Sequence, residues 1–168
     1  MIEIEKIIIN EIELFLNQTM DDNITNDDDA FEVRYEKWLF GGESQGDYAW
    51  NLYWNNNPVA SISNGNNPDK NNVRIVDIFS RQKGMGSKLI MMLLDEGVVI
   101  ETGIPERHSI STKAYYLVRK IIDIINNNSQ KYKYTVLGKA NNDGLDDNEH
   151  YKDIKDKQDN FHYRFEAI

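Results

Sequence analysis

Apolar and polar residues alternate along much of the first half of the chain, in the pattern of half-buried strands. Phe31, Val33 and Tyr35, for example, are each followed by a charged residue. A period of two places the apolar side chains on one face of a strand. We predict four such strands, over residues 31–35, 48–54, 59–62 and 73–79. The Asn-, Gly- and Pro-rich segments 55–58 and 64–72 supply turns, so the pattern predicts an antiparallel meander.

Helical spacing replaces this alternation after residue 86. Apolar residues recur three and four positions apart between Leu89 and Leu94, which predicts a helix over 87–96 that stops at Gly97. The apolar positions between 114 and 125 predict a second helix. Three further strands are predicted, over residues 98–102, 132–137 and 161–168.

The remaining segments are less regular. Residues 1–20 fit either one helix or a strand followed by a helix from Asn10, and both interpretations stay open. Residues 21–30 read as an acidic loop, and residues 138–160 as a polar insertion before the last strand. No repeat or linker divides the chain, so we predict a single domain over residues 1–168.

Composition excludes several classes of protein. The 168 residues contain no cysteine, which excludes a disulfide scaffold, a thiolate nucleophile and a cysteine-ligated zinc or iron–sulfur site. The net charge of −9 leaves no basic surplus for binding nucleic acid. No apolar run reaches the length of a membrane span, and the N-terminus lacks the pattern of a secretory signal. We therefore expect a soluble, cytoplasmic protein.

One segment combines glycines and cations where a strand runs into a helix. After the strand ending near Phe79 come Arg81, Lys83, Gly84 and Gly86, and the helix follows directly. Glycines let backbone N–H groups approach an anion, and a helix N-terminus favours negative charge. A diphosphate would suit this loop. The spacings of the dinucleotide fingerprint and of the Walker-type phosphate loop are both missing, and a plain tight turn is the alternative.

The segment resembles the acetyl-CoA-binding motif of the GNAT superfamily of N-acetyltransferases, R/Q-x-x-G-x-G/A, as Arg81-Gln-Lys-Gly84-Met-Gly86. Val76 stands where that family has an apolar residue on its fourth strand. The order of predicted elements is also similar over residues 45–137 and in the last strand, but not over 1–30 or 138–160. The resemblance implies an α/β (α+β) fold with a mixed, mostly antiparallel central sheet and helices on both faces.

The resemblance also implies which residues bind the cofactor. Main-chain N–H groups of the loop would wrap the diphosphate of acetyl-CoA, and a splay between the fourth and fifth strands would admit its pantetheine arm. The arm would pair with backbone around Val76, Asp77 and Ile78. The residues expected at the diphosphate are Arg81, Gln82, Lys83, Gly84, Met85, Gly86 and Ser87.

The catalytic residues are less clear from the sequence. If Ser111 and Ala114 match the family's pattern, its usual tyrosine is replaced by Val118, so we expect Tyr116 to act as the general acid instead. Packing on the sheet is an equally good interpretation of Tyr116. Glu101 is the expected general base, with Asp77 as second choice and a solvent-facing role as the alternative for both. Ser109 or Ser111 would cap the second helix.

The resulting hypothesis is an enzyme that moves an acetyl group from acetyl-CoA directly to a primary amine. The acidic chain favours a cationic acceptor, either a small molecule or a protein lysine or N-terminus. The rival hypothesis is a catalytically weak or inactive GNAT-like module, such as a phage-type inhibitor, that acts by binding another protein. A homodimer or homo-oligomer built through the terminal strands is also compatible with the pattern.

Other candidate sites are weaker. His108, His150 and His162 share no metal-ligand spacing, and the Asp143-Gly144 segment lacks the ligands of a calcium loop, so we expect no metal. The three tryptophans with nearby tyrosines fit core packing better than an acceptor pocket.

Overall fold

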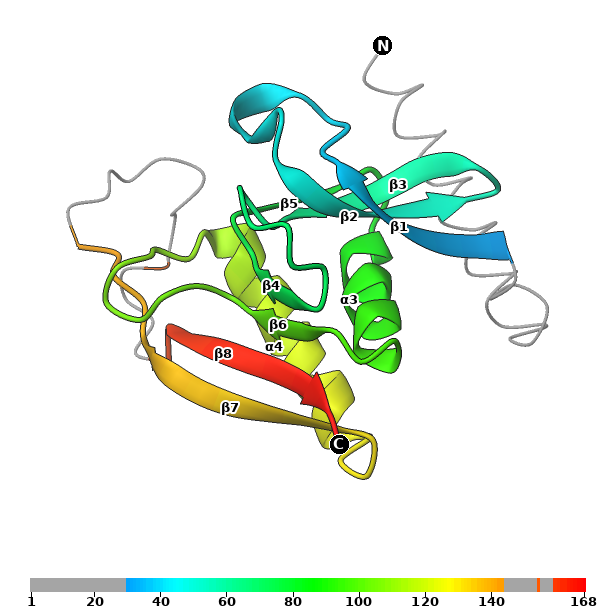
Figure 1. Cartoon of the computed structure of the whole chain (residues 1–168). Coiled ribbons are helices and arrows are strands. Elements are labelled where there is room, and N and C mark those ends of the chain that lie inside the picture. Colours follow the sequence, from blue (N-terminus) through cyan, green and yellow to red (C-terminus); the bar gives the residue numbers. More distant parts are fainter. Residues whose placement is uncertain (1–29, 144–153, 155–158) are drawn as a thin grey trace, which may run out of the picture.

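The computed structural model describes residues 30–143, 154 and 159–168. Within them, eight strands form two four-stranded sheets, accompanied by two α-helices and a short 3-10 helix (Figure 1). The predicted mixed α/β class is confirmed. Residues 1–29, where helix and strand both stayed open, lie outside the described residues, as does most of the predicted polar insertion.

The first sheet is fully antiparallel and contains most of the predicted meander. Its strand order is β1-β2-β3-β5, with bounds Phe31–Lys37, Tyr48–Trp54, Asn57–Ser63 and Asp77–Ser80. The β2–β3 turn is confirmed: Asn55 and Asn56 have φ angles of 49° and 65°, which a two-residue hairpin of type I′ requires. The 3-10 helix η2 (Gly42–Ser44) lies in the connection between β1 and β2.

The second sheet contains the later strands. Its order is β4-β6-β8-β7, with bounds Asn72–Arg74, Val99–Glu101, Phe161–Ala167 and Tyr132–Lys139. β4 and β6 run parallel, whereas β8 is antiparallel to both β6 and β7. The sheet that was expected to be single is therefore divided into two.

In the view of Figure 1, helix α4 lies behind the second sheet, and helix α3 lies beside that sheet and below the first. Helix α3 (Met85–Asp95) contacts strands of both sheets and helix α4 (Thr112–Asn126). Its predicted apolar face is confirmed, because Leu89, Leu93 and Leu94 are fully buried. The expected helices on both faces of a sheet are not found in this part of the chain, where α3 and α4 occupy the same side.

The predicted strand over residues 73–79 divides because two neighbouring amides bond to different sheets. The Ile75 N–H donates to the Glu101 carbonyl in the second sheet, at 2.9 Å. The next amide, of Val76, donates to the Ser63 carbonyl in the first sheet, also at 2.9 Å. The chain crosses between sheets at this point, so β5 diverges from β6 and a gap opens beyond Val76.

Candidate functional site

The loop between β5 and α3 presents an open helix N-terminus. Gly84, the residue before α3, has φ = 87°, a left-handed conformation that favours glycine. No side chain caps the helix and its first turn contains no acidic residue. Helix α4 differs, because the Ser111 hydroxyl oxygen accepts the Ala114 N–H at 3.2 Å, which confirms the predicted serine cap. The Met85 N–H, the first of α3, donates to the Gln82 carbonyl at 3.2 Å. The next amides, of Gly86 and Ser87, have no capping side chain from Gly84 and are suited to an external anion.

Cationic side chains surround this helix start. A cavity of about 410 Å³, here called the phosphate-loop cavity, is formed by Ile78, residues 80–84, Gly86 and Ser87 and by one face of α4. Met85, which was also expected at the diphosphate, is buried in the core and does not line this cavity. Arg81 and Lys83 come from the loop, as predicted, and Lys113 and Lys120 come from α4. Among the residues that the structure describes, none of those lining this cavity is acidic.

Sequence reasoning missed the two lysines on α4. Lys113, Tyr116 and Lys120 are spaced by three and four residues, so they share one helix face. That spacing is readable from the sequence, but nothing in it shows that this face opposes the glycine loop. Helix packing brings them there: the Lys120 Nζ lies 3.9 Å from the position that a Cβ on Gly84 would occupy.

A larger cavity of about 700 Å³, here called the cleft cavity, occupies the gap where β5 leaves β6. Its floor is apolar and includes Ile90 and Phe165. Ile78, Lys113 and Leu117 line both the cleft cavity and the phosphate-loop cavity. The two cavities therefore adjoin at these residues, and together they are here called the groove, from the α3 N-terminus to the gap between the sheets.

One wall of the cleft cavity is acidic. Glu43 and Asp47 approach it from the connection between β1 and β2, and Asp77 from β5. Ser44 Oγ donates to Asp77 Oδ2 at 3.0 Å, and Ser63 Oγ donates to Asp47 Oδ2 at 2.7 Å. These bonds hold two of the carboxylates in place. The groove is thus cationic at one end and anionic at the other.

Backbone groups at the gap differ from those inside the sheets. The Ile78 N–H donates to the Asp77 carboxylate at 2.8 Å. The resemblance implied that backbone around Val76, Asp77 and Ile78 would face the pantetheine arm. All three residues line the cleft cavity, together with Val118, the position of the missing tyrosine.

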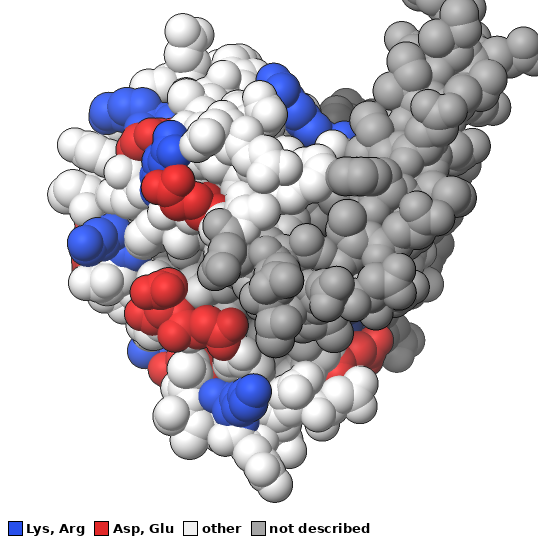
Figure 2. Space-filling view, turned by 90° about the vertical axis from the view of Figure 1, so that its right-hand side faces the viewer, with Lys and Arg blue, Asp and Glu red and all other residues white. Residues whose placement is uncertain are grey.

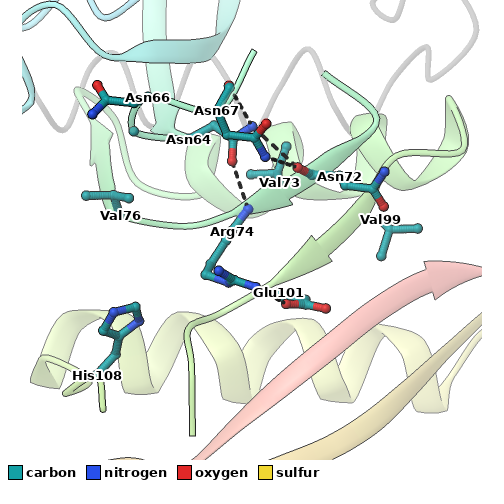
Figure 3. A pocket seen from close by; sticks show the side chains of 11 residues that line it. Asn64, Asn66, Asn67, Asn72, Val73, Arg74, Val76, Val99, Glu101 and His108 are labelled. Carbon is teal, nitrogen blue, oxygen red and sulfur yellow. Dashed lines mark hydrogen bonds and ion pairs between the residues drawn. The ribbon is translucent and has the colours of Figure 1, made fainter. Parts of the chain in front are cut away.

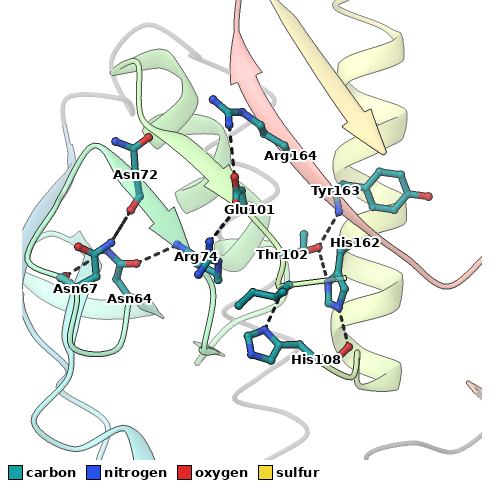
Figure 4. Close-up of polar contacts among 11 residues, drawn as sticks. Asn64, Asn67, Asn72, Arg74, Glu101, Thr102, His108, His162, Tyr163 and Arg164 are labelled. Carbon is teal, nitrogen blue, oxygen red and sulfur yellow. Dashed lines mark hydrogen bonds and ion pairs between the residues drawn. The ribbon is translucent and has the colours of Figure 1, made fainter. Parts of the chain in front are cut away.

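Glu101, the expected base, lies in a third cavity on the opposite sheet face (Figure 3). This opposite-face pocket, of about 360 Å³, is bordered by the asparagine-rich loop 64–67 and by Arg74. Glu101 pairs with Arg74 at 3.4 Å and with Arg164 at 3.5 Å (Figure 4). Both of its carboxylate oxygens are thus engaged by arginines on this face, away from the cleft cavity. Val76 lines this pocket as well as the cleft cavity.

Tyr116, the expected acid, lies in the phosphate-loop cavity and not in the cleft cavity. Its side chain is 56% exposed. The neighbouring Tyr115 is buried and its hydroxyl donates to Asp159 at 2.7 Å. The structure therefore brings Tyr116 together with Arg81 and Lys83, and separates it from Glu101.

Buried His162 of β8 anchors the segment between β6 and α4 (Figure 4). Its Nε2 donates to the His108 carbonyl at 2.8 Å, and its Nδ1 lies 3.0 Å from Thr102 Oγ1. Because Thr102 Oγ1 accepts the Tyr163 N–H, its own hydroxyl proton can bond to Nδ1. Gly103 permits this approach, since a Cβ there would lie 2.4 Å from His162 Cε1. The anchor positions one wall of the cleft cavity.

This anchor predicts a pH-dependent stability. Burial lowers the pKa of His162 below its ordinary value of 6.5. As the pH falls below about 6.5, the unfolded chain binds a proton that the folded chain resists, so the free energy of unfolding is expected to decrease. Above that pH both states hold a neutral His162 and its contribution is constant.

Urea unfolding between about pH 5 and pH 8 measures this dependence. His162→Gln is expected to reduce the fall of the unfolding free energy below pH 6.5. The same pH dependence in wild type and in His162→Gln would contradict the assignment.

The other candidates contribute little to a site. Trp38 is buried, and no tryptophan of the described ranges lines these three cavities. No group of three metal-ligating side chains occurs among the described residues, and no helix there is long and apolar enough to cross a membrane. On the face seen in Figure 2, acidic and basic side chains are interspersed, in contrast to the cation-lined phosphate-loop cavity.

Comparisons with family models, with curated proteins and with solved structures find no match to this chain. The resemblance to the GNAT superfamily therefore stands on Arg81, Gly84 and Gly86 and on the order of elements.

Proposed function

We propose that this protein is an acetyl-CoA-dependent N-acetyltransferase that acts directly on a primary amine. One observation carries the proposal: a cation-lined cavity at an uncapped helix start continues into an acidic-walled cavity between diverging strands. The first end suits a diphosphate and the second suits an amine. A thioester lying in the groove between them would be held beside its acceptor, which lowers the entropic part of the barrier.

The reaction needs one proton acceptor and one proton donor. The ammonium group of the acceptor first loses one proton, and its neutral nitrogen attacks the thioester carbonyl carbon. A C–N bond forms, the nitrogen loses its second proton, the C–S bond breaks, and CoA leaves as a thiolate that takes up a proton, so one proton is released to solvent in each turnover. With an amine pKa of ~10.4, deprotonation at pH 7 costs about 4–5 kcal/mol. A thiol pKa near ~8.5 makes the leaving thiolate a weak base, so water or a hydroxyl suffices as its donor.

We assign the proton-acceptor role to Asp77. It lines the cleft cavity, and its two hydrogen bonds, from Ser44 and from the Ile78 amide, leave further lone pairs on its oxygens. Glu101 is less suitable because two arginines already bind it. Glu43 and Asp47 on the same wall favour an acceptor with additional positive charge.

A CoA-binding module without turnover is the second candidate. The observation in its favour is that no tyrosine lines the cleft cavity in the described part of the chain, where Val118 occupies the position expected for one. Binding and turnover must therefore be tested separately. Thiol release from acetyl-CoA with a panel of amines (polyamines, amino sugars, lysine peptides) decides between the two candidates.

Cofactor binding is tested by thermal unfolding with and without acetyl-CoA. A ligand that binds only the folded state at ~100 times its Kd stabilises it by about 2.7 kcal/mol. For a chain of this size we expect the Tm to rise by roughly 5–10 °C. Inorganic diphosphate at the same concentration is the control for general anion effects and is expected to give a much smaller shift. No shift at millimolar acetyl-CoA would contradict the proposed function.

A further inference from the structure

The phosphate-loop cavity contains more positive charge than a diphosphate needs. Four cations line it, from the loop and from α4, and no salt bridge joins them to an acidic residue among the described residues. Loop amides and the α3 N-terminus already serve a diphosphate, which carries a charge of about −2. In a chain with a net charge of −9, such an unpaired cluster indicates a ligand with further negative charge.

The four cations fall into two pairs. Arg81 and Lys83 belong to the loop itself, and the Arg81 guanidinium lies 5.1 Å from the centre of the Phe40 ring. Lys113 and Lys120 lie seven residues apart on α4, which is about 10 Å along the helix axis. Lys113 also lines the cleft cavity, whereas Lys120 lines only the phosphate-loop cavity. Lys120 therefore marks the end of the groove that is farther from the cleft.

An aromatic ring lies between the two α4 lysines. Tyr116 follows Lys113 by three residues and precedes Lys120 by four. The residue is more than half exposed, and its ring makes a T-shaped contact with that of buried Tyr115, with ring centres 5.3 Å apart at an angle of 81°. An exposed aromatic face between two cations is suited to a nucleobase that carries a phosphate.

We propose that Lys120 binds the 3′-phosphate of CoA and that Tyr116 is a stacking surface for its adenine. This inference rests on the proposed function. A 3′-phosphomonoester adds about −1.5 to −2 units of charge at pH 7, which Lys120 would balance in part. It also gives Tyr116 a cofactor-binding role in place of the general-acid role that the sequence suggested. The protein would then discriminate CoA from ligands that lack the 3′-phosphate.

Calorimetric titration of wild type with CoA and with 3′-dephospho-CoA tests the phosphate contact. We expect CoA to bind about tenfold more tightly, the effect of one charge-assisted contact. Lys120→Met is expected to remove that advantage, with about tenfold weaker binding of CoA and less than about twofold change for 3′-dephospho-CoA. Lys113→Met is the matched control and is expected to weaken both ligands alike.

The outcomes separate this inference from the proposed function. Equal affinities of wild type for the two ligands, or equal losses for both in Lys120→Met, would overturn the phosphate contact while leaving CoA binding intact. Loss of the preference for CoA over 3′-dephospho-CoA in Lys113→Met, but not in Lys120→Met, would also overturn it. If neither ligand binds at millimolar concentration, the proposed function itself fails.

Tyr116 is tested with two substitutions. Tyr116→Phe keeps the ring and is expected to change the Kd for CoA by less than about twofold, whereas Tyr116→Ala is expected to weaken binding roughly tenfold. Equal affinity in all three proteins would exclude the stacking role. If Tyr116→Phe lowers the rate of thiol release without changing the Kd for CoA, Tyr116 acts as the general acid. That result would overturn its assignment as a cofactor-binding residue only.

Discussion

Replacing Gly84 by Glu is expected to abolish acetyl-CoA binding. A Cβ at this position meets only the Lys120 Nζ, at 3.9 Å, so a longer side chain would extend into the phosphate-loop cavity. Its carboxylate would stand beside the diphosphate and pair with a cation that the ligand needs. Repulsion between unit charges ~4 Å apart near a protein surface is worth about 4 kcal/mol, so we expect at least a 100-fold rise in Kd.

Gly84→Gln is the matched control, because glutamine has the size of glutamate without its charge. Both side chains force a non-glycine residue into a left-handed conformation, at a cost to folding of about 1–2 kcal/mol. We expect Gln to weaken binding by less than about tenfold. Similar losses in the two variants, at equal stability in urea, would mean that the loop does not hold an anion. Unchanged binding of acetyl-CoA by Gly84→Glu would mean that the cofactor binds in another part of the protein.

Asp77→Asn is expected to reduce the rate of thiol release by about 100-fold or more at saturating acetyl-CoA. General base catalysis contributes typically ~10²–10⁴-fold, and an amide cannot accept the amine proton. Asparagine has the same shape, its oxygen can still accept the Ile78 N–H, and its NH₂ group can donate to Ser44 Oγ. The Kd for acetyl-CoA and the unfolding free energy are therefore expected to change little, which calorimetry and urea unfolding check.

Two comparisons sharpen this test. Asp47→Asn removes a carboxylate from the same acidic wall, and we expect it to raise the KM for a cationic amine with little effect on kcat. Glu101→Gln tests the base that the sequence favoured, and we expect a loss of stability from releasing Arg74 and Arg164 without a comparable loss of kcat. If Glu101→Gln abolishes turnover and Asp77→Asn does not, the roles are reversed.

Most of the secondary structure could be predicted because it depends on local pattern. The strand over 48–54, the helix containing Leu89 and Leu94, and the Asn55-Asn56 turn all follow from apolar spacing and turn chemistry. The split of the strand over 73–79 could not, because Val73 and Ile75 alternate as in any single strand. Pairing with one sheet or the other is decided by distant partners, Ser63 and Glu101.

The candidate site likewise has parts that follow from local sequence and parts that depend on distant residues. The glycine loop with Arg81 and Lys83 was readable, because its residues are contiguous and their chemistry is specific. The positions of Glu101 and Tyr116 in the folded protein could not be predicted from the sequence. Glu101 fits a cleft-facing carboxylate by register, yet β6 presents it to the opposite sheet face, where two arginines bind it.

The sequence by itself determined a mixed α/β chain, the start of α3 at a glycine-rich loop and the acidic charge of the whole. Each depends on neighbouring residues or on composition. Only the tertiary structure decided that one groove joins Lys113 and Lys120 of α4 to that loop at one end and Asp77 to the acidic wall at the other. The physical reason is that helix packing and the crossing between sheets set which surfaces face each other, and residues from η2, β5 and α4 meet only when the chain is folded.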